Sequence, residues 1–372
     1  MQPTEQARED MILELCALAG DFPVSLLDCL SGSKEWSKQT VARLVQQDKL
    51  IRRYKHDNIK SLRLTKKGRD LLLRVNRERF CNLLEGAGAT RIRQTDLPRR
   101  LRFHSMAAVF LMMLDTGVTV HRDEKADIFG KDYWERGPTS VLKQWSPPCF
   151  YISLEIKQQG YETLRIRNTR TAGVLFTEAL SPYLVYNTCA APIRWSSISE
   201  QKMSGIIEGT LRGWKLPVSD PAGLMFGDSM DTLFRLINSG GGIKRRSYYV
   251  DGTFPDFYFV PISEDGKLML RLLCSEQARQ RIAGRLSVGL TKPRYTKYVL
   301  DAVLDGKSVL FAWDLNMVRL KYFREGLQYE QDKGIVFCMD FQAPALKSLF
   351  GELAEIRVIG RDIFAKELRD GS

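Results

Sequence analysis

The segment from Trp36 to Leu73 changes its hydrophobic period twice, and this change most constrains how the chain can fold. Its first part, "WSKQTVARLVQQ", places apolar residues at helical spacing. Two short runs, "KLIRRY" and "IKSLRLT", then alternate apolar and polar residues around Asp57-Asn58, which predicts a β-hairpin. The pattern of "KKGRDLLLRV" is helical again, and Thr65 is placed to cap that helix.

Two helices are predicted before this segment. Ile12, Leu15 and Leu18 recur at helical spacing in "REDMILELCALAG", and a short second helix follows in "DFPVSLLDCL". Ser33 is placed to cap the third helix, over residues 34–47. Three helices, a hairpin and a closing helix are typical of a winged helix-turn-helix. The expected fold class is α+β, with this module at residues 1–80 followed by a larger mixed α/β domain.

Positive charge is concentrated in the same segment. The chain carries a net charge of +12, and residues 34–79 alone hold fifteen Lys and Arg against five Asp and Glu. Residues 1–33 hold one Arg against six acidic residues. Such a focused excess is expected of a surface that binds phosphate. A basic face that meets only solvent is the alternative.

Double-stranded DNA is the partner that this arrangement favours. A helix fits the major groove and presents side chains to base edges, while a wing meets phosphates or the minor groove. The predicted helix contacts are Ser37, Lys38, Gln39, Thr40 and Arg43. The predicted contacts of the wing and the following helix are Arg52, Arg53, Lys55, Lys60, Arg63 and Lys66. Modules of this kind also bind proteins, so an adaptor that meets an acidic partner remains an alternative.

Residues 81–125 are expected to form a basic linker and an apolar helix, "LRFHSMAAVFLMMLDTGV". A secondary basic surface is predicted from Arg91, Arg93, Arg99, Arg100, Arg167 and Arg170. The three histidines lack metal-ligand spacing, and the seven cysteines are scattered without a CxxC pair. No metal, cofactor or disulfide framework is therefore expected.

Residues 126–372 read as a mixed α/β domain, divisible near residues 215–225. Short β-rich runs such as "PYLVYNT" and "SVLFAWDL" are separated by helix-like stretches such as "GDSMDTLFRLIN". No internal repeat stands out in the sequence. The glycine loop "SGGGIKRR" lacks the Gly-Lys-Ser/Thr of a P-loop, so nucleotide binding is not expected.

A metal-dependent nuclease is the second functional alternative. "ISLEIK" places Glu155 and Lys157 as the E-x-K half of a nuclease motif on an expected strand, with Asp127 or Asp132 as the second carboxylate. Carboxylates in such sites hold Mg²⁺, and the lysine helps to activate water. Against it, the only Pro-Asp pair of this kind, at Asp256, follows the E-x-K by about 100 residues. The sequence therefore leaves an enzymatic role open but favours a protein without one, and Mg²⁺ is expected only under this alternative.

No run approaches the ~20 apolar residues that span a bilayer. The N-terminus "MQPTEQARED" carries acidic residues where a signal peptide is basic and then apolar. The sequence thus predicts a cytoplasmic protein without membrane contact.

Three stretches resemble replication–relaxation type winged-helix proteins, which are encoded on plasmids and integrative conjugative elements of Gram-positive bacteria. They are "LTKKGRDLL", "RRLRFHSMAAVFLMMLDTG" and "FYISLEIK…IRNTRTAGVLFTEALSPYLVYNT". The resemblance implies a DNA-binding winged helix joined to an α/β domain that is sometimes nuclease-like. The order of Pro-Asp and E-x-K departs from the nuclease-like pattern.

The function expected from the sequence is site-specific binding of double-stranded DNA by a protein of a mobile genetic element. Its role would lie in replication, conjugative transfer or transcription regulation. The C-terminal domain would serve assembly or partner contact, either as a homodimer or with other proteins of the element. A Mg²⁺-dependent nuclease or nicking accessory and a protein-interaction adaptor are the alternatives.

Overall fold

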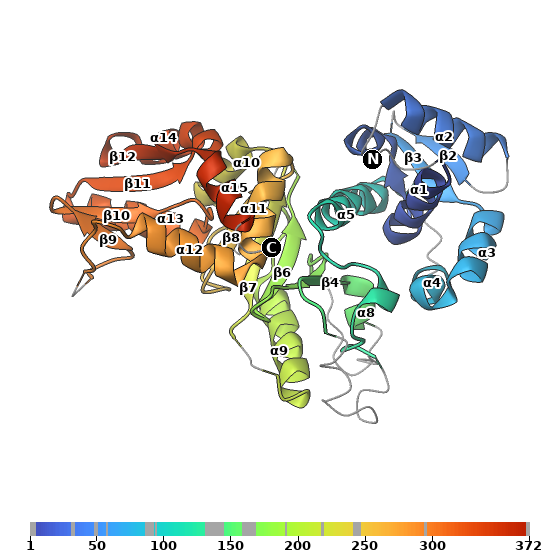
Figure 1. Cartoon of the computed structure of the whole chain (residues 1–372), viewed down its shortest axis with the longest axis horizontal. Coiled ribbons are helices and arrows are strands. Elements are labelled where there is room, and N and C mark those ends of the chain that lie inside the picture. The colour runs from blue at the N-terminus through green and yellow to red at the C-terminus, as the bar shows by residue number, and fades with distance from the viewer. Residues whose placement is uncertain are drawn as a thin grey trace. The chain divides into compact units, whose positions relative to one another are not determined.

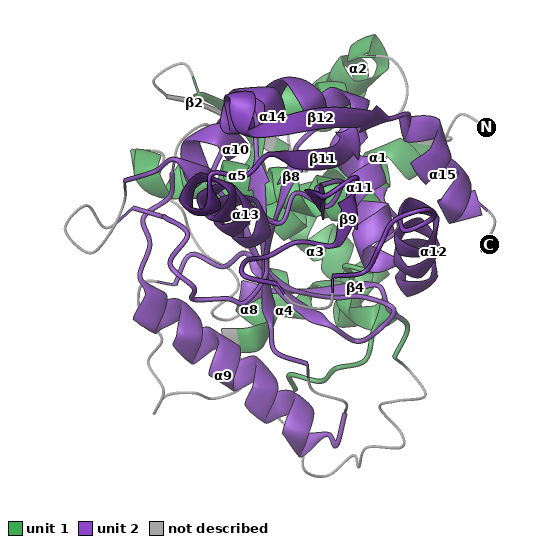
Figure 2. Ribbon diagram, turned by 90° about the vertical axis from the view of Figure 1, so that its left-hand side faces the viewer, with its two compact units in different colours: residues 1–115, 119–146, 154–159 green, residues 116–118, 147–153, 160–372 purple. Residues whose placement is uncertain are grey.

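The computed structural model describes residues 5–30, 34–47, 51–56, 59–85, 93, 95–130, 145–157, 169–189, 192–216, 219–240, 247–293 and 296–369. Side chains of residues 5, 52–56 and 157 lie outside this description. The chain folds as a mixed α+β protein with two compact units (Figure 2). Unit 1 comprises residues 1–115, 119–146 and 154–159, and unit 2 comprises residues 116–118, 147–153 and 160–372.

Unit 1 opens with helices and a three-stranded antiparallel sheet (Figure 1). Its elements are α1 (Glu5–Ala19), β1 (Phe22–Pro23), the 3-10 helix η1 (Val24–Cys29), α2 (Lys34–Gln46), β2 (Ile51–His56), β3 (Ile59–Leu64) and α3 (Lys66–Val75). β3 lies between β1 and β2. The hairpin predicted from the alternating pattern is β2–β3, with Ile51 opposite Leu64. Asp57 and Asn58 lie outside the described residues.

The apolar spacing of these elements builds one core. Ile12 and Leu15 of α1, Val41 and Leu44 of α2, and Leu62 of β3 are buried. Residues three and four apart share a helix face, so each helix turns one apolar stripe inward. The Thr65 hydroxyl accepts the Gly68 N–H at 3.3 Å, and α3 begins where the sequence predicts it.

The remainder of unit 1 contains α4 (Arg77–Leu84), α5 (Leu97–Asp115) and the 3-10 helix η3 (Arg122–Glu124). α5 is the apolar helix that the sequence predicts within residues 81–125, and it belongs to unit 1. A buried polar cluster ties it to the sheet. The Arg100 guanidinium donates to the Asp21 carboxylate at 3.1 Å and to the Ser61 hydroxyl at 2.9 Å, and the His104 ring bonds to Asp21 at 3.1 Å.

A second polar cluster joins α1, α4 and η3. The Arg79 guanidinium bonds to the Asp123 carboxylate at 2.9 Å and to the Glu14 carboxylate at 3.3 Å. The Asn76 amide donates to Asp123 at 2.8 Å, and Asn76 also caps α4 by accepting the N–H of Arg79. These contacts fix α4 against α1 by bonded charges as well as by apolar packing.

Unit 2 begins with a five-stranded sheet in the order β4-β5-β6-β7-β8. Its elements are β4 (Cys149–Ile152), β5 (Gly173–Phe176), β6 (Pro182–Asn187), α9 (Ser197–Gly213), β7 (Ala222–Gly227), α10 (Met230–Ile237), β8 (Phe257–Pro261), α11 (Glu264–Cys274) and α12 (Glu276–Leu286). β4, β5 and β6 pair antiparallel, whereas β6, β7 and β8 pair parallel. Five buried aromatic rings pack together beside β6 and β8, from Tyr186, Trp195, Tyr248, Phe254 and Phe257.

A second sheet of four strands follows, in the order β12-β11-β10-β9 (Figure 1). Its elements are β9 (Ala302–Leu304), β10 (Lys307–Phe311), α13 (Met317–Glu330), β11 (Gly334–Met339), the 3-10 helix η4 (Asp340–Gln342), α14 (Ala343–Phe350), the 3-10 helix η5 (Gly351–Leu353), β12 (Ala354–Ile359) and α15 (Arg361–Arg369). β9 and β10 pair antiparallel, and β10, β11 and β12 pair parallel.

The two sheets repeat one topology. In each, an antiparallel strand pair (β5–β6 or β9–β10) is followed by helix, parallel strand, helix, parallel strand and helix. We call the segments β5–α11 and β9–α15 the first and second halves of unit 2. The sequence shows no internal repeat, because strands such as "AGLMFG" and "GIVFCM" share only their apolar character.

Candidate nucleic-acid interface

α2 has one buried and one exposed face. Ser37, Thr40, Val41 and Leu44 are buried. Lys34, Glu35, Lys38, Gln39, Ala42 and Gln46 are exposed. Lys38 and Gln39 therefore lie on the solvent face, as the sequence predicted. The prediction was wrong for Ser37 and Thr40, which point into the protein.

Internal hydrogen bonds explain why these two hydroxyls are buried. The Arg8 guanidinium donates to the Ser37 hydroxyl at 2.6 Å, and the Thr40 hydroxyl donates to the Trp36 carbonyl at 2.9 Å. Arg8 also lies over the Trp36 ring, 4.5 Å from its centre. Polar groups bonded in this way can be buried at little cost. Ser37, Trp36 and Arg8 thus hold α2 against α1.

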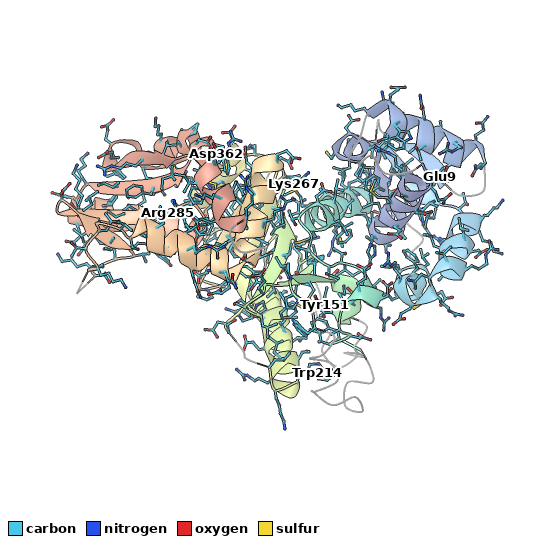
Figure 3. The ribbon with its side chains drawn as sticks, viewed as in Figure 1. Glu9, Tyr151, Trp214, Lys267, Arg285 and Asp362 are labelled. Atoms are coloured by element: carbon cyan, nitrogen blue, oxygen red, sulfur yellow. The ribbon has the colours of Figure 1, made fainter. Side chains whose placement is uncertain are left out.

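Acidic side chains already pair with the cations of α2. The pairs are Lys34–Asp28 at 3.0 Å, Lys38–Glu35 at 3.5 Å and Arg43–Glu9 at 2.6 Å. The two lysine pairs are exposed, and such pairs contribute little, so a phosphate can replace the acid. Arg43 is less accessible, because it is half-buried and pairs with Glu9. Glu9, which lies on α1, is labelled in Figure 3.

The hairpin carries cations opposite cations. Its register sets Arg63 opposite Arg52 and Lys60 opposite Lys55, while Arg53 lies opposite Leu62. Like charges directly opposite each other destabilise an antiparallel pair. Lys60 is exposed and Arg63 is half-buried. The side chains of Arg52, Arg53 and Lys55 lie outside the described residues.

The first turn of α3 adds Lys66, which is exposed beside the end of β3. In the part of the chain that the structure describes, no acidic side chain pairs with Lys60 or Lys66. α2 and β2 are neighbours, and β2 pairs with β3. We call the exposed face of α2, the β2–β3 hairpin and the first turn of α3 the helix–hairpin surface.

The described residues of the predicted secondary basic surface are divided between the two units. Arg93 and Arg99 are exposed in unit 1, but Arg100 is buried in the cluster with Asp21, so its predicted surface role is wrong. Arg170 is half-buried in unit 2. Arg91 and Arg167 lie outside the described residues.

The expected strand placement of Glu155 and Lys157 is wrong. β4 ends at Ile152, and residues 153–157 form the short helix α8. Glu155 is buried, and its carboxylate accepts a hydrogen bond from the Lys125 ammonium at 3.0 Å. The Glu155 carboxylate is therefore engaged by a lysine within the same unit. Asp132 lies outside the described residues, and Asp127 pairs with Arg122 at 2.8 Å.

One buried and one half-buried carboxylate in unit 2 were not singled out from the sequence. Glu200 accepts hydrogen bonds from the Thr169 hydroxyl at 2.8 Å, the Arg170 N–H at 3.0 Å and the Tyr186 hydroxyl at 2.9 Å. Burial raises the pKa of Glu200 despite these donors. Isolated acids on a helix carry no sequence signal for burial, and only the folded contacts reveal the role of this one.

Asp314 is the second of these carboxylates. It follows β10, where its oxygen accepts the Asn316 N–H at 3.2 Å. Burial raises the pKa of the Asp314 carboxyl to about 6, although the nearby guanidinium groups of Arg319 and Arg279 act in the opposite direction. Such a shift marks a group that is neutral at mildly acidic pH.

No known family, curated protein or solved structure matches the chain. None of the described helices combines the length and apolar character needed to cross a bilayer. Over the same residues, no group of three or more His, Cys, Asp or Glu side chains is arranged to hold a metal ion.

Proposed function

We propose that residues 5–75 form a winged helix-turn-helix that binds duplex DNA through the helix–hairpin surface. The observation that carries this proposal is the order of elements: α1, β1, η1, α2 and the β2–β3 hairpin, with β3 in the middle of the sheet. That order places an exposed polar helix face, with Lys38 and Gln39, next to a basic hairpin.

The two parts of this surface suit different parts of a duplex. α2 has the dimensions to enter the major groove, where the Gln39 amide can bond to a base edge. Lys60 and Lys66 can meet phosphates on the backbone. Phosphates between the paired cations of the hairpin would also remove their mutual repulsion.

The wider role follows from the same proposal and the resemblance noted above. A DNA-binding module attached to a separate α/β unit suits a cytoplasmic protein that marks a site on a mobile element and recruits or assembles others there. Replication, transfer and transcription regulation all require such a protein. We propose an assembly role for unit 2. The nuclease alternative is less favoured, because its Glu155 lies in unit 1 and pairs there with Lys125.

Duplex-DNA affinity of single variants tests this proposal. Lys60→Ala and Lys66→Ala should each weaken binding to every sequence and reduce the slope of log Kd against log salt by about 0.9, the value for one lost phosphate contact. Lys202→Ala is the matched control, since Lys202 is an exposed lysine on α9 of unit 2. Equal slopes in all three variants would contradict the proposed surface.

Gln39→Ala separates base recognition from phosphate contact. Loss of a base-edge bond should cost about 1–3 kcal/mol at the preferred site and leave both random-sequence binding and the salt slope unchanged. An equal loss of affinity for all DNA sequences would show that Gln39 contacts the DNA backbone instead of a base edge. Salt-sensitive binding to an acidic protein without DNA competition would favour an adaptor.

A further inference from the structure

One edge of the second sheet of unit 2 is open. β12 pairs with β11 on one side and ends the strand order. The opposite edge, β9, is covered, because Thr291 and Val303 exchange two backbone hydrogen bonds of 3.1 and 2.9 Å. Within the described ranges, no backbone group bonds to the outer side of β12. An open strand edge is a template for another strand.

The first half of unit 2 shows how the equivalent edge is completed. β8 is the counterpart of β12, and its outer side pairs antiparallel with the segment after β10, through the bridge between Tyr258 and Asn316. The Phe259 N–H donates to the Leu315 carbonyl at 3.1 Å. Within the described residues no segment takes this place along β12, and the chain after β12 forms α15, which packs through Phe364 against Trp313. The second half therefore lacks the antiparallel partner that the first half has.

The side chains of β12 are complementary to a second copy of the same strand. Glu355 and Arg357 lie two residues apart, so they share one face of the sheet, and they form an exposed ion pair of 2.8 Å. Between and beside them are Ile356 and Val358, and Val358 is 51% exposed. In an antiparallel pair centred on Ile356, Glu355 of each strand lies opposite Arg357 of the other. Centring the pair on Glu355 or Arg357 instead would set like charges opposite each other.

We propose that a second copy of this chain pairs with β12, antiparallel and about a two-fold axis at Ile356, so that the two four-stranded sheets form one continuous sheet. The interface is isologous, since each strand supplies the same residues to the other. Opposite charges at directly opposed positions stabilise this register relative to the registers centred on Glu355 or Arg357. Val358 then faces Ala354 of the partner strand and loses part of its contact with water.

The mass of the full chain in solution gives the first test. Light scattering coupled to size-exclusion chromatography should find a dimer at micromolar concentration that dissociates on dilution. Hydrogen exchange at the β12 amides should slow as the dimer forms. A monomer at all concentrations up to several hundred micromolar would overturn the proposal.

Charge reversal tests the register itself. Glu355→Arg and Arg357→Glu should each yield a monomer, because each sets like charges opposite each other in the pair. Mixed in equal amounts, the two variants should form a heterodimer, since every opposed pair is again of opposite charge. The double variant Glu355→Arg/Arg357→Glu should return to a homodimer. Glu325→Arg, at an exposed position of α13, is the control and should remain dimeric.

Native mass spectrometry of the mixture identifies the heterodimer, and circular dichroism confirms that each variant is folded. A dimer that survives both single reversals would place the interface elsewhere. Single variants that dissociate but fail to form a dimer when mixed would reject the antiparallel register at Ile356.

Discussion

At the scale of single residues, unit 1 depends on a buried charge that is fully bonded. Burial alone would raise the pKa of the Asp21 carboxyl, but hydrogen bonds from His104, Ser61 and Arg100 outweigh it and hold the pKa below its ordinary value. Because the folded pKa is lowered, this group stabilises the fold above its unfolded pKa, and the contribution is lost as pH falls. Arg100 therefore acts in stability, not in DNA contact.

Replacing Arg100 by methionine should destabilise unit 1 by about 3–5 kcal/mol, because the Asp21 carboxylate would remain buried without its cation. Denaturant unfolding of the full chain measures this change. Arg99→Met is the control, since Arg99 is the exposed neighbour on the same helix and should shift stability by less than about 1 kcal/mol. Equal losses in the two variants would contradict the role assigned to Arg100.

Asp314 should make unit 2 less stable at neutral pH than at acidic pH. Its pKa is raised to about 6 in the folded protein, so the stabilising contribution of the neutral carboxyl is present below the unfolded pKa near 4 and is lost as pH rises through 6. Asp314→Asn keeps an acceptor for Asn316 and should stabilise the protein by roughly 1–3 kcal/mol at pH 8, with little effect at pH 4.

Thermal unfolding at the two pH values checks the Asp314 prediction, with Glu325→Gln as an exposed control on α13. A variant that is destabilised at pH 8 would show that Asp314 is needed as a charged partner of the neighbouring arginines.

At the scale of elements, we predict that the like charges of the β2–β3 hairpin lower the stability of the fold and strengthen DNA binding. Lys60→Glu converts the pair opposite Lys55 from like to opposite charge, which should stabilise the free protein by about 0.2–1 kcal/mol. The same change should weaken DNA binding, since it replaces a phosphate-binding cation by an anion. Unfolding and DNA affinity, measured on the same sample, must move in opposite directions. If Lys60→Glu raised both the free energy of unfolding and the DNA affinity, the hairpin would not be part of the DNA interface.

Sequence patterns predicted α1, α2, the β2–β3 hairpin and α3, because each has a local cause, but they missed β1 and α4, and the expected second helix is the 3-10 helix η1. The alternation around residues 51–64 specifies the hairpin, and the Thr65 cap fixes the start of α3. The period of the apolar residues on α2 also gave Val41 and Leu44 as buried. These features depend only on neighbours in the chain.

Features that depend on distant partners were not predictable in this way. Ser37 and Thr40 look like exposed polar residues, and the Arg8 side chain that accompanies Ser37 into the interior comes from α1. Glu155 fits a strand by composition, but β4 ends at Ile152 and the Lys125 ammonium pairs with the carboxylate. The repeated topology of unit 2 is likewise set by strand pairing, which apolar runs of similar composition do not reveal.

At the scale of the whole molecule, the two proposals support each other. A single small module reads few base pairs, and a two-fold dimer presents two modules to two half-sites. If β12 joins two chains, DNA binding should be cooperative in protein concentration. The monomeric Glu355→Arg variant should bind the same site more weakly. Its slope of log Kd against log salt should equal that of one DNA-binding module. Equal affinity of the monomeric variant and the unaltered protein would show that one module suffices.

A salt series tests most directly whether the helix–hairpin surface binds duplex DNA. The affinity of the full chain is measured for random and element-derived duplexes between about 50 and 200 mM salt. We predict a steep linear fall of log affinity with log salt, tighter binding to one element-derived fragment, and a shallower slope for Lys60→Ala. Absence of binding at the lowest salt, or a slope near zero, would contradict this prediction.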